Sequence, residues 1–306
     1  MVRSPSTAKM ATFGLAVAMM LTGIGMGLAN PSPAHAANEL APLERAPVEH
    51  YDVLHLNIHG HVGNADSPDE VVALVDNLTE LIRTRQPDLV SLNEVCKSQA
   101  DGLELALGEQ YVLYASLGWW PAVSKPACGG SFGRAVMVRR DLAQGGEGFA
   151  VQFPVEVDEA IRPFVCFEIT PRSALFCTAH LTSGSRADRD LERARQVQTI
   201  HEVFEPYNHD DWDIILAGDL NMRPQDDNLD SIYDGRRYRD GQGIYREADP
   251  RYLRVKEATH DGGAPIDYIF INDQPASISP PTITPVPYSD HHVYEATVTI
   301  TPPSGN

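Results

Sequence analysis

Eight polar side chains of this sequence have types that suit the hydrolysis of phosphate esters, and each lies where an apolar run begins or ends. They are Asn57, Glu94, His180, Asp219, Asn221, Asp267, Asp290 and His291. Carboxylate and carboxamide oxygens bind hard divalent cations, and an imidazole can move a proton near neutral pH. Each residue alone is more often a turn, a cap or a surface histidine. The ordered set is therefore the informative feature.

The apolar runs predict the elements that position these side chains. Strands are expected over Tyr51–Ile58, Leu89–Val95, Ala135–Val138, Phe164–Thr170, Ser173–His180, Asp213–Ala217, Ile266–Ile271 and Tyr294–Ile300. A helix should begin after Ser67, with Pro68 at its first position and Glu70 completing a capping box. A second, charged helix should run from about 188 to 204. The mixture of strands, helices and hairpins predicts an α+β fold, and side chains at one end of several strands can converge on one site.

With these motifs in this order, the chain resembles the endonuclease/exonuclease/phosphatase superfamily. The resemblance rests on Asn57, Glu94, His180-Leu181, Gly218-Asp219-Leu220-Asn221, Ile266-Asp267-Tyr268-Ile269 and Ser289-Asp290-His291. Members include deoxyribonuclease I, apurinic endonucleases, inositol-polyphosphate phosphatases and neutral sphingomyelinases. The resemblance implies a four-layer sandwich, in which two mixed β-sheets pack face to face with helices on the outside.

The resemblance also implies a divalent cation, Mg²⁺ or alternatively Mn²⁺ or Ca²⁺. Glu94 would be a metal ligand with Asp290 nearby, and Asn57 would orient Glu94 and the metal. A bound cation neutralises the negative charge of a phosphodiester, which otherwise repels a nucleophile. The sequence does not indicate which of the three cations is preferred.

The remaining site residues are expected to handle protons and phosphate. By the same resemblance, His291 is the acid/base histidine and Asp267 orients it. A carboxylate on one imidazole nitrogen fixes the tautomer, so that the other nitrogen can act. Asp219 and Asn221 would position the attacking water or hold phosphate and metal, and His180 would donate to a non-bridging phosphate oxygen.

The sequence departs from the deoxyribonuclease I pattern beside His180. Members of that type carry a glutamate that pairs with this histidine, whereas this chain has Gly133-Arg134-Ala135 at the corresponding place. His180 is therefore expected to lack that partner. Arg134 either contacts phosphate or is a surface arginine at a strand start. Arg195 and Gln198 match an Arg-x-x-Gln pattern, for which packing on a solvated helix is favoured over catalysis.

Residues 1–36 have the pattern of a cleaved signal peptide. Arg3 and Lys9 precede an apolar run, and Ala34-His35-Ala36 supplies the small residues that signal peptidase requires. We therefore expect a secreted protein with one domain over 37–306, no stable membrane insertion after processing, and a monomeric state. The net charge of −18 argues against an unaided electrostatic grip on nucleic acid.

The four cysteines are expected to form two disulfides, because an even number in an exported chain favours pairing. Cys166 and Cys177 lie symmetrically on the two strands of the predicted hairpin, which leaves Cys96 to pair with Cys128. No Cys-x-x-Cys pair is present, so a zinc site is improbable.

The substrate is left open by the sequence. A nuclease-type phosphodiesterase is favoured, with nucleic acid or a phospholipid head group as substrate. The alternatives are a sphingomyelinase-like phospholipase C, an inositol or sugar phosphate phosphatase, and a catalytically silent binding module. Trp119-Trp120 could contact a membrane, and the arginines and tyrosines of 233–254 could bind phosphate and bases. A buried tryptophan pair and a solvated loop are the simpler interpretations of these two features.

Overall fold

The computed structural model describes residues 49–60, 64–119, 126–154, 163–236, 240–249, 256–272 and 276–300. The predicted signal peptide, Trp120 and most arginines of the 233–254 loop lie outside these residues. All described residues belong to one compact unit, 44–306. None of the helices in the described part of the chain is long and apolar enough to cross a bilayer.

Two mixed sheets form the centre of this unit. The first has the order β11-β13-β1-β2-β4-β3, with β12 also paired to β13, and the second has the order β5-β6-β7-β8-β10-β9. The first comprises β1 (Glu49–Asn57), β2 (Leu89–Cys96), β3 (Tyr111–Trp119), β4 (Ser131–Arg139), β11 (Ala276–Ile278), β12 (Thr282–Pro285) and β13 (His292–Ile300). The second comprises β5 (Gly148–Gln152), β6 (Pro163–Ile169), β7 (Ala174–His180), β8 (Asp213–Asp219), β9 (Tyr245–Glu247) and β10 (Asp267–Asn272). The pairs β1–β2 and β7–β8 are parallel, and the other ladders are antiparallel.

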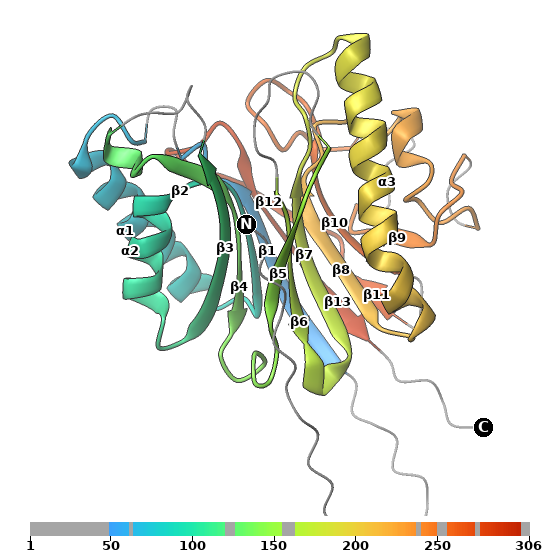
Figure 1. Ribbon diagram of the computed structural model, residues 1–306, viewed down its shortest axis with the longest axis horizontal. Helices are drawn as coiled ribbons and strands as arrows, with labels where there is room; N and C mark the ends of the chain where they lie inside the picture. Colours follow the sequence, from blue (N-terminus) through green and yellow to red (C-terminus); the bar gives the residue numbers. More distant parts are fainter. Residues whose placement is uncertain are drawn as a thin grey trace, which may run out of the picture. The chain divides into compact units, whose positions relative to one another are not determined.

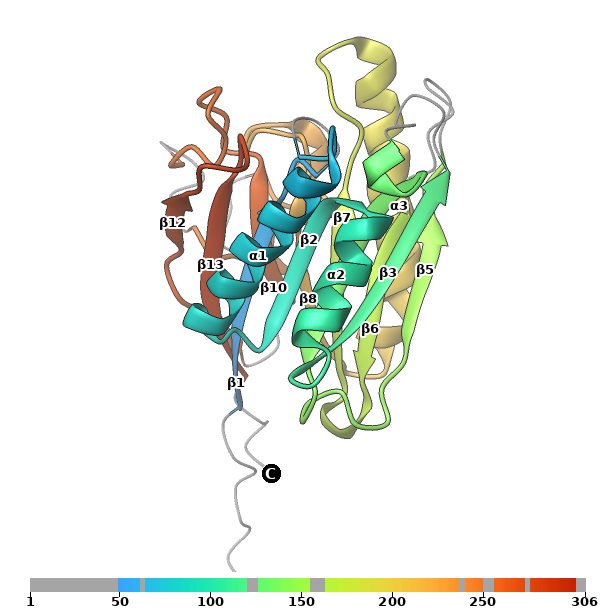
Figure 2. The same cartoon turned by 90° about the vertical axis from the view of Figure 1, so that its left-hand side faces the viewer.

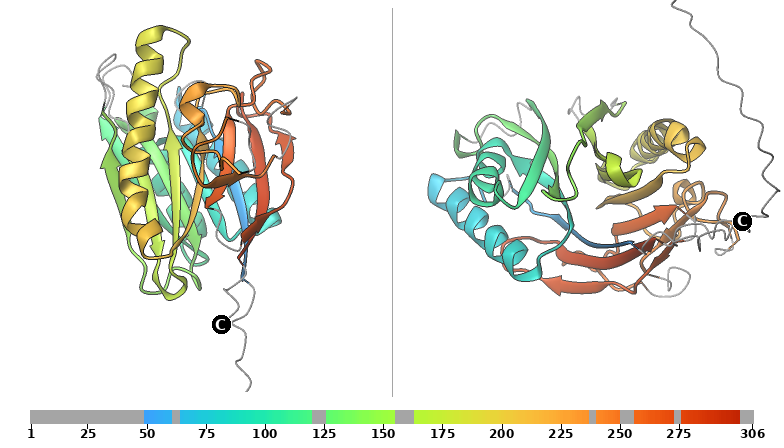
Figure 3. Two further views of the ribbon diagram at one scale, coloured as in Figure 1. Left: turned by 90° about the vertical axis from the view of Figure 1, so that its right-hand side faces the viewer. Right: turned by 90° about the horizontal axis from the view of Figure 1, so that it is seen from below.

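Helices cover the outer faces of both sheets (Figures 1 and 2). Helices α1 (Pro68–Arg85) and α2 (Lys97–Leu107) lie on the first sheet, and α3 (Ala187–His209) lies on the second. The view from below shows the resulting four layers (Figure 3). The predicted α+β sandwich is therefore confirmed. The predicted start of α1 is also confirmed, because Ser67 and Glu70 form a capping box and Pro68 opens the helix.

The inner faces of the sheets change from apolar to polar along the strands. Because side chains alternate between faces, Tyr51 and Val53 of β1 lie between the sheets, and His55 and Asn57 continue the same face. In β8, Ile215 and Ala217 precede Asp219, and in β7, Phe176 precedes Thr178 and His180. The apolar ends form the core between the sheets. The polar ends all lie at one edge of the sandwich, which we call the mouth.

Some elements were not predicted. Helix α2 and strands β3, β5, β9, β11 and β12 are additions to the expected set. Both predicted disulfides are present: Cys166 and Cys177 face each other directly across β6 and β7, and Cys96 is bonded to Cys128. The disulfides leave no free cysteine, so a thiolate zinc site is excluded.

Candidate active site

The side chain of Asn57 lies at the centre of the mouth. Its Nδ2 is 3.4 Å from Glu94 Oε1, 3.2 Å from Asp219 Oδ2 and 3.4 Å from His291 Nε2. These groups come from β1, from β2, from β8 in the opposite sheet, and from the residue that precedes β13. The structure thus brings together four side chains that are far apart in the sequence. They converge because the polar ends of these strands lie at the same edge of the sandwich.

His291 and Asp267 form a closely paired dyad. His291 Nδ1 lies 2.9 Å from Asp267 Oδ2, while His291 Nε2 faces Asp219 Oδ2 at 3.6 Å. Burial disfavours the charged imidazole, but the carboxylates of Asp267 and Asp219 outweigh it and raise the pKa of His291 to about 10. Burial likewise opposes ionisation of Asp267, and the imidazoles of His291 and His55 outweigh it, so the pKa of Asp267 is lowered.

Asp219 is the second buried carboxylate of the mouth. Burial raises its pKa to about 7, against the opposing charge of His291. Its Oδ1 accepts from the backbone N–H of Asn221 at 2.9 Å, and Asn221 Nδ2 donates to the carbonyl of Leu181 at 3.1 Å. His180 Nε2 lies 3.4 Å from Asp219 Oδ2. His180 was expected to lack a carboxylate partner, but Asp219 of β8 is such a neighbour. It lies beside His180 where deoxyribonuclease I-like members use a glutamate of the strand that matches β4.

Glu94 reaches the mouth because β2 contains a bulge. The register of β2 on β4 shifts between Asn93 and Val95, and Glu94 adopts a left-handed backbone conformation with φ of 60°. A glycine permits this geometry. A Cβ on Gly60 would lie 2.3 Å from the carbonyl oxygen of Glu94.

Asp290 lies between two histidines that the sequence did not single out. His59 Nδ1 is 3.1 Å from Asp290 Oδ1, and His260 Nε2 is 3.5 Å from Asp290 Oδ2. The hydrogen bond from His59 is the main reason that the pKa of Asp290 is lowered to about 2. The rings of His260 and His291 pack edge to face, with centroids 4.7 Å apart. Asp290 is thus held ionised beside the dyad.

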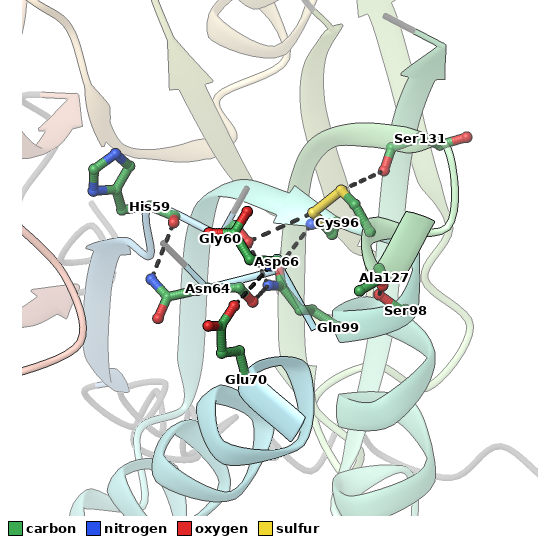
Figure 4. The surroundings of a disulfide bond; sticks show 11 residues. His59, Gly60, Asn64, Asp66, Glu70, Cys96, Ser98, Gln99, Ala127 and Ser131 are labelled. Atoms are coloured by element: carbon green, nitrogen blue, oxygen red, sulfur yellow. Dashed lines mark hydrogen bonds between the residues drawn. A yellow bond between two sulfur atoms is a disulfide. The ribbon is translucent and has the colours of Figure 1, made fainter. Parts of the chain in front are cut away.

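A disulfide and one glutamine fix the loop that carries His59 (Figure 4). Gln99 Nε2 donates to the carbonyls of Gly60 at 2.6 Å and Asn64 at 3.1 Å, and its Oε1 accepts from the N–H of Cys96 at 2.9 Å. Asn64 in turn donates to the carbonyl of His59 at 3.1 Å. The Cys96–Cys128 bond therefore lies in the same cluster as the loop beside Glu94.

The structure places Arg134 in the interior. Only 2% of its surface is exposed, and its Nη2 donates to the carbonyl of His180 at 2.8 Å. The surface alternative is wrong, and the buried guanidinium supports the chain of β7. Contact of Arg134 with substrate phosphate, the other alternative, stays a prediction.

Helix α3 carries two overlapping Arg-x-x-Gln pairs, which have different surroundings. Arg195 and Gln198 are exposed, as the favoured interpretation required. Arg193 and Gln196 are buried. Arg193 Nη1 donates to the carbonyl of Thr182 at 2.8 Å, and Gln196 Oε1 accepts from the N–H of Thr182 at 2.9 Å. This pair fixes the segment that follows His180.

The donor atoms at the mouth fit a hard divalent cation. Glu94 and Asp290 are carboxylates that are only partly buried, and the Asn57 carboxamide lies between Glu94 and the dyad. Two further sets of donor atoms lie within 4.8 Å of one another: His260, Asp290 and His291, and Asp219, Asp267 and His291. Among the described residues, oxygen and imidazole donors thus surround one small volume.

A family model now adds to this geometry. The model of the endonuclease/exonuclease/phosphatase family matches residues 54–291, which include every residue of the mouth. The chain belongs to this family. It is an enzyme of the class that hydrolyses phosphate esters. No curated protein sequence matches the chain.

Solved structures of the family share the fold. Human nocturnin, solved with bound sulfate, has a TM-score of 0.62 and 16% identity, over 81% of this chain and 93% of that one. Truncated Caenorhabditis elegans TDP2 has a TM-score of 0.59 and 14% identity, over 82% and 98%. D. rerio TDP2 complexed with single strand DNA product has a TM-score of 0.59 and 15% identity, over 81% and 98%. At these identities the likeness establishes the fold alone.

Proposed function

We propose that the protein is a secreted, divalent-metal-dependent phosphodiesterase of the nuclease type. The observation that carries the proposal is the His291–Asp267 dyad at 2.9 Å, facing Asp219 and the Asn57–Glu94 pair across the mouth. A non-catalytic member of the fold would have no need to keep buried carboxylates beside a histidine, because their desolvation is costly. The complete set therefore favours catalysis over a silent binding module.

Glu94, Asn57 and Asp290 are proposed to hold the cation. A bound Mg²⁺ or similar ion would neutralise the phosphate and stabilise the charge that develops during hydrolysis. The bulge at Glu94 and the clamp of His59 on Asp290 present both carboxylates in fixed positions. Fixed ligands favour one coordination geometry.

The buried side of the mouth is proposed to move protons and orient the substrate. Asp267 holds His291 through Nδ1, which leaves Nε2 to exchange a proton with a phosphate oxygen or water. Asp219, kept in place by the N–H of Asn221, would position the attacking water. His180 would donate to a non-bridging oxygen. These roles require no movement of the strands, because all the side chains already face one volume.

A generic phosphodiester tests the reaction class. We expect hydrolysis of bis-(p-nitrophenyl) phosphate with Mg²⁺, Mn²⁺ or Ca²⁺, abolished by excess EDTA and restored by added metal. Full turnover in EDTA would refute the metal requirement. No turnover with any of the three cations, in protein that is folded by circular dichroism, would instead favour the silent module.

A substrate panel tests the finer assignment. The D. rerio TDP2 structure holds a single strand DNA product, which supports nucleic acid as the first substrate to try. Rates on DNA, RNA, sphingomyelin and inositol phosphates should be compared at one metal concentration and ionic strength. Preference for sphingomyelin or for a phosphomonoester would replace the nuclease assignment by the corresponding alternative.

Secretion and the monomeric state remain part of the proposal. The Ala34-His35-Ala36 site supports export with cleavage after Ala36. N-terminal sequencing of protein recovered from the culture medium should begin at Ala37. Light scattering of the same material should give the mass of one processed chain, and a doubled mass would refute the monomer.

A further inference from the structure

A chain of buried polar side chains lies between the two sheets, directly beneath the mouth. His55, Ser91, Asn93, Thr178 and Asp267 all have 0% of their surface exposed. His55 Nε2 lies 3.0 Å from Asp267 Oδ1, and His55 Nδ1 lies 2.8 Å from Ser91 Oγ. Asp267 therefore carries two imidazoles, one on each oxygen: His291 toward the mouth and His55 toward the core.

The path of hydrogen-bonded side chains continues from Ser91 to Asp219, the other buried carboxylate of the site. Ser91 Oγ is 2.7 Å from Thr178 Oγ1, which accepts from Asn93 Nδ2 at 2.9 Å. Asn93 Oδ1 accepts from the backbone N–H of Asp219 at 3.0 Å. Asp267 and Asp219 are thus connected through side chains of β1, β2 and β7, by a path that crosses four times between the sheets.

The chemistry of these groups gives the path one direction of donation. An ionised Asp267 only accepts, so His55 Nε2 must donate to it. In a neutral imidazole Nδ1 then accepts from the Ser91 hydroxyl, which in turn accepts from the Thr178 hydroxyl. The other possible acceptor for Ser91, the carbonyl of Ala217, is farther away at 3.3 Å. Each proton in the path then has one assigned acceptor.

Stability alone gives little reason to keep this path. A buried polar chain is often no more stabilising than apolar side chains of the same volume, and Val136, Ile215 and Ile269 fill the same inter-sheet layer farther from the mouth. Among the described residues, His55, Ser91, Asn93 and Thr178 lie where the layer reaches Asp267 and Asp219. Their placement points to the carboxylates as the groups that need them.

We propose that His55 is a positioning residue of the site, which holds Asp267 so that its second oxygen stays aligned with His291. This role rests on the proposed function. His55 does not reach the mouth, so it acts only through Asp267. Outer partners of this kind typically change activity by about 10–100-fold when they are removed.

Two substitutions separate this role from a packing role. In His55→Gln the amide nitrogen lies near the place of Nε2 and still donates to Asp267, whereas in His55→Asn the shorter amide reaches only toward Ser91. We expect His55→Gln to retain kcat within about threefold, and His55→Asn to lose about 10–100-fold in kcat with little change in KM. His50→Asn is the matched control, because His50 is an exposed histidine at the far end of the same strand.

The rates are to be measured on bis-(p-nitrophenyl) phosphate with Mg²⁺, beside a thermal melt of each variant. A purely structural role would lower kcat in proportion to stability and would not distinguish glutamine from asparagine. Equal kcat for wild type, His55→Gln and His55→Asn would overturn the proposal, as would equal losses in the two variants.

A measurement on the unsubstituted protein covers the case of an inactive enzyme or an unfolded variant. In protein labelled with ¹⁵N-histidine, the His55 ring should carry a proton on Nε2 that is protected from exchange with solvent. A ring protonated on Nδ1 alone could not donate to Asp267 and would refute the proposal. Absence of hydrolysis with a protonated Nε2 would refute the proposed function and leave the His55–Asp267 bond established.

Discussion

The mouth has two halves that place their carboxylates in different surroundings. The open half contains Glu94 and Asp290, and the Asp290 side chain is 38% exposed. The closed half contains Asp219 and Asp267, whose side chains are 2% and 0% exposed. The pKa of Asp290 is lowered to about 2 by the His59 hydrogen bond, while burial raises that of Asp219 to about 7. Neighbours and solvent, not residue type, therefore set the charge of each carboxylate.

The difference indicates a division of labour. Carboxylates that stay ionised and partly accessible are suited to bind a cation from solution. Buried carboxylates that are held by histidines and backbone N–H groups are suited to orient a histidine or a water molecule. If the two halves are separable, a substitution in one half should leave the role of the other half intact.

Glu94→Gln should abolish activity through the open half. The substitution keeps the size of the side chain and removes the negative charge that attracts the cation. Loss of several kcal/mol of metal-derived stabilisation corresponds to a fall in kcat of about 10³-fold or more. Turnover and Mg²⁺ affinity should both be measured, the latter by calorimetry. A variant that loses turnover but binds Mg²⁺ with normal affinity would show that Glu94 is not a metal ligand.

His291→Ala should lower kcat by about 10²–10⁴-fold, because a positioned acid/base group is lost. The fold should persist, since His291 precedes β13 and packs against other mouth residues. His292→Ala is the control: His292 Nε2 lies 3.0 Å from Asp261 Oδ1, away from the dyad. Steady-state kinetics of both variants show which of the two adjacent histidines is the acid/base group. A dead His292→Ala beside an active His291→Ala would contradict the assignment of the dyad.

Asp267→Asn should cost less than loss of the His291 ring, on the order of 10–100-fold in kcat. The ring remains, but an asparagine offers only one oxygen to two imidazole donors, His291 and His55. Mg²⁺ affinity should stay near the wild-type value, because the closed half is altered and the open half is not. A large loss of Mg²⁺ binding in this variant would show that the halves are not separable.

Removal of a disulfide should have the smallest effect on activity, and the effect should depend on which of the two disulfides is removed. Loop-closure entropy predicts losses of roughly 4 kcal/mol in unfolding free energy without Cys96–Cys128 and roughly 3 kcal/mol without Cys166–Cys177, which close separations of 32 and 11 residues. Paired serine variants should be compared by urea unfolding and by kinetics. Only loss of Cys96–Cys128 should lower Mg²⁺ affinity as well, because Cys96 lies two residues from Glu94. Equal Mg²⁺ affinity in both variants would contradict this.

The sequence predicted the sandwich, and which side chains lie together at the mouth, better than it predicted their contacts. Asn57, Glu94 and Asp219 could be identified because each interrupts or ends an apolar run, and strand ends at one edge converge. His55 was missed because it lies inside the run Leu54-His55-Leu56. Its signal was the alternation: His55 and Asn57 share a face of β1, while Leu54 and Leu56 face the helices.

Other contacts depend on which strands pair within a sheet and on how the two sheets face each other, which no local pattern encodes. Arg134 bonds to the carbonyl of His180 because β4 and β7 face each other. Asp219 is the carboxylate neighbour of His180 because β8 is parallel to β7 and ends beside it. Helix α2 was missed for a local reason, since its N-cap is the disulfide-bonded Cys96 and not one of the usual capping residues.

The bulge at Glu94 determines which changes in chain length the protein can tolerate. Leu92 and Val95 both face the helices although they are three residues apart, because Glu94 is the extra residue between them. Deletion of one residue here would turn Glu94 away from the mouth or Cys96 away from Cys128. Variants of this enzyme, natural or designed, must therefore keep the residue count from Asn93 to Cys96 and the glycine at 60.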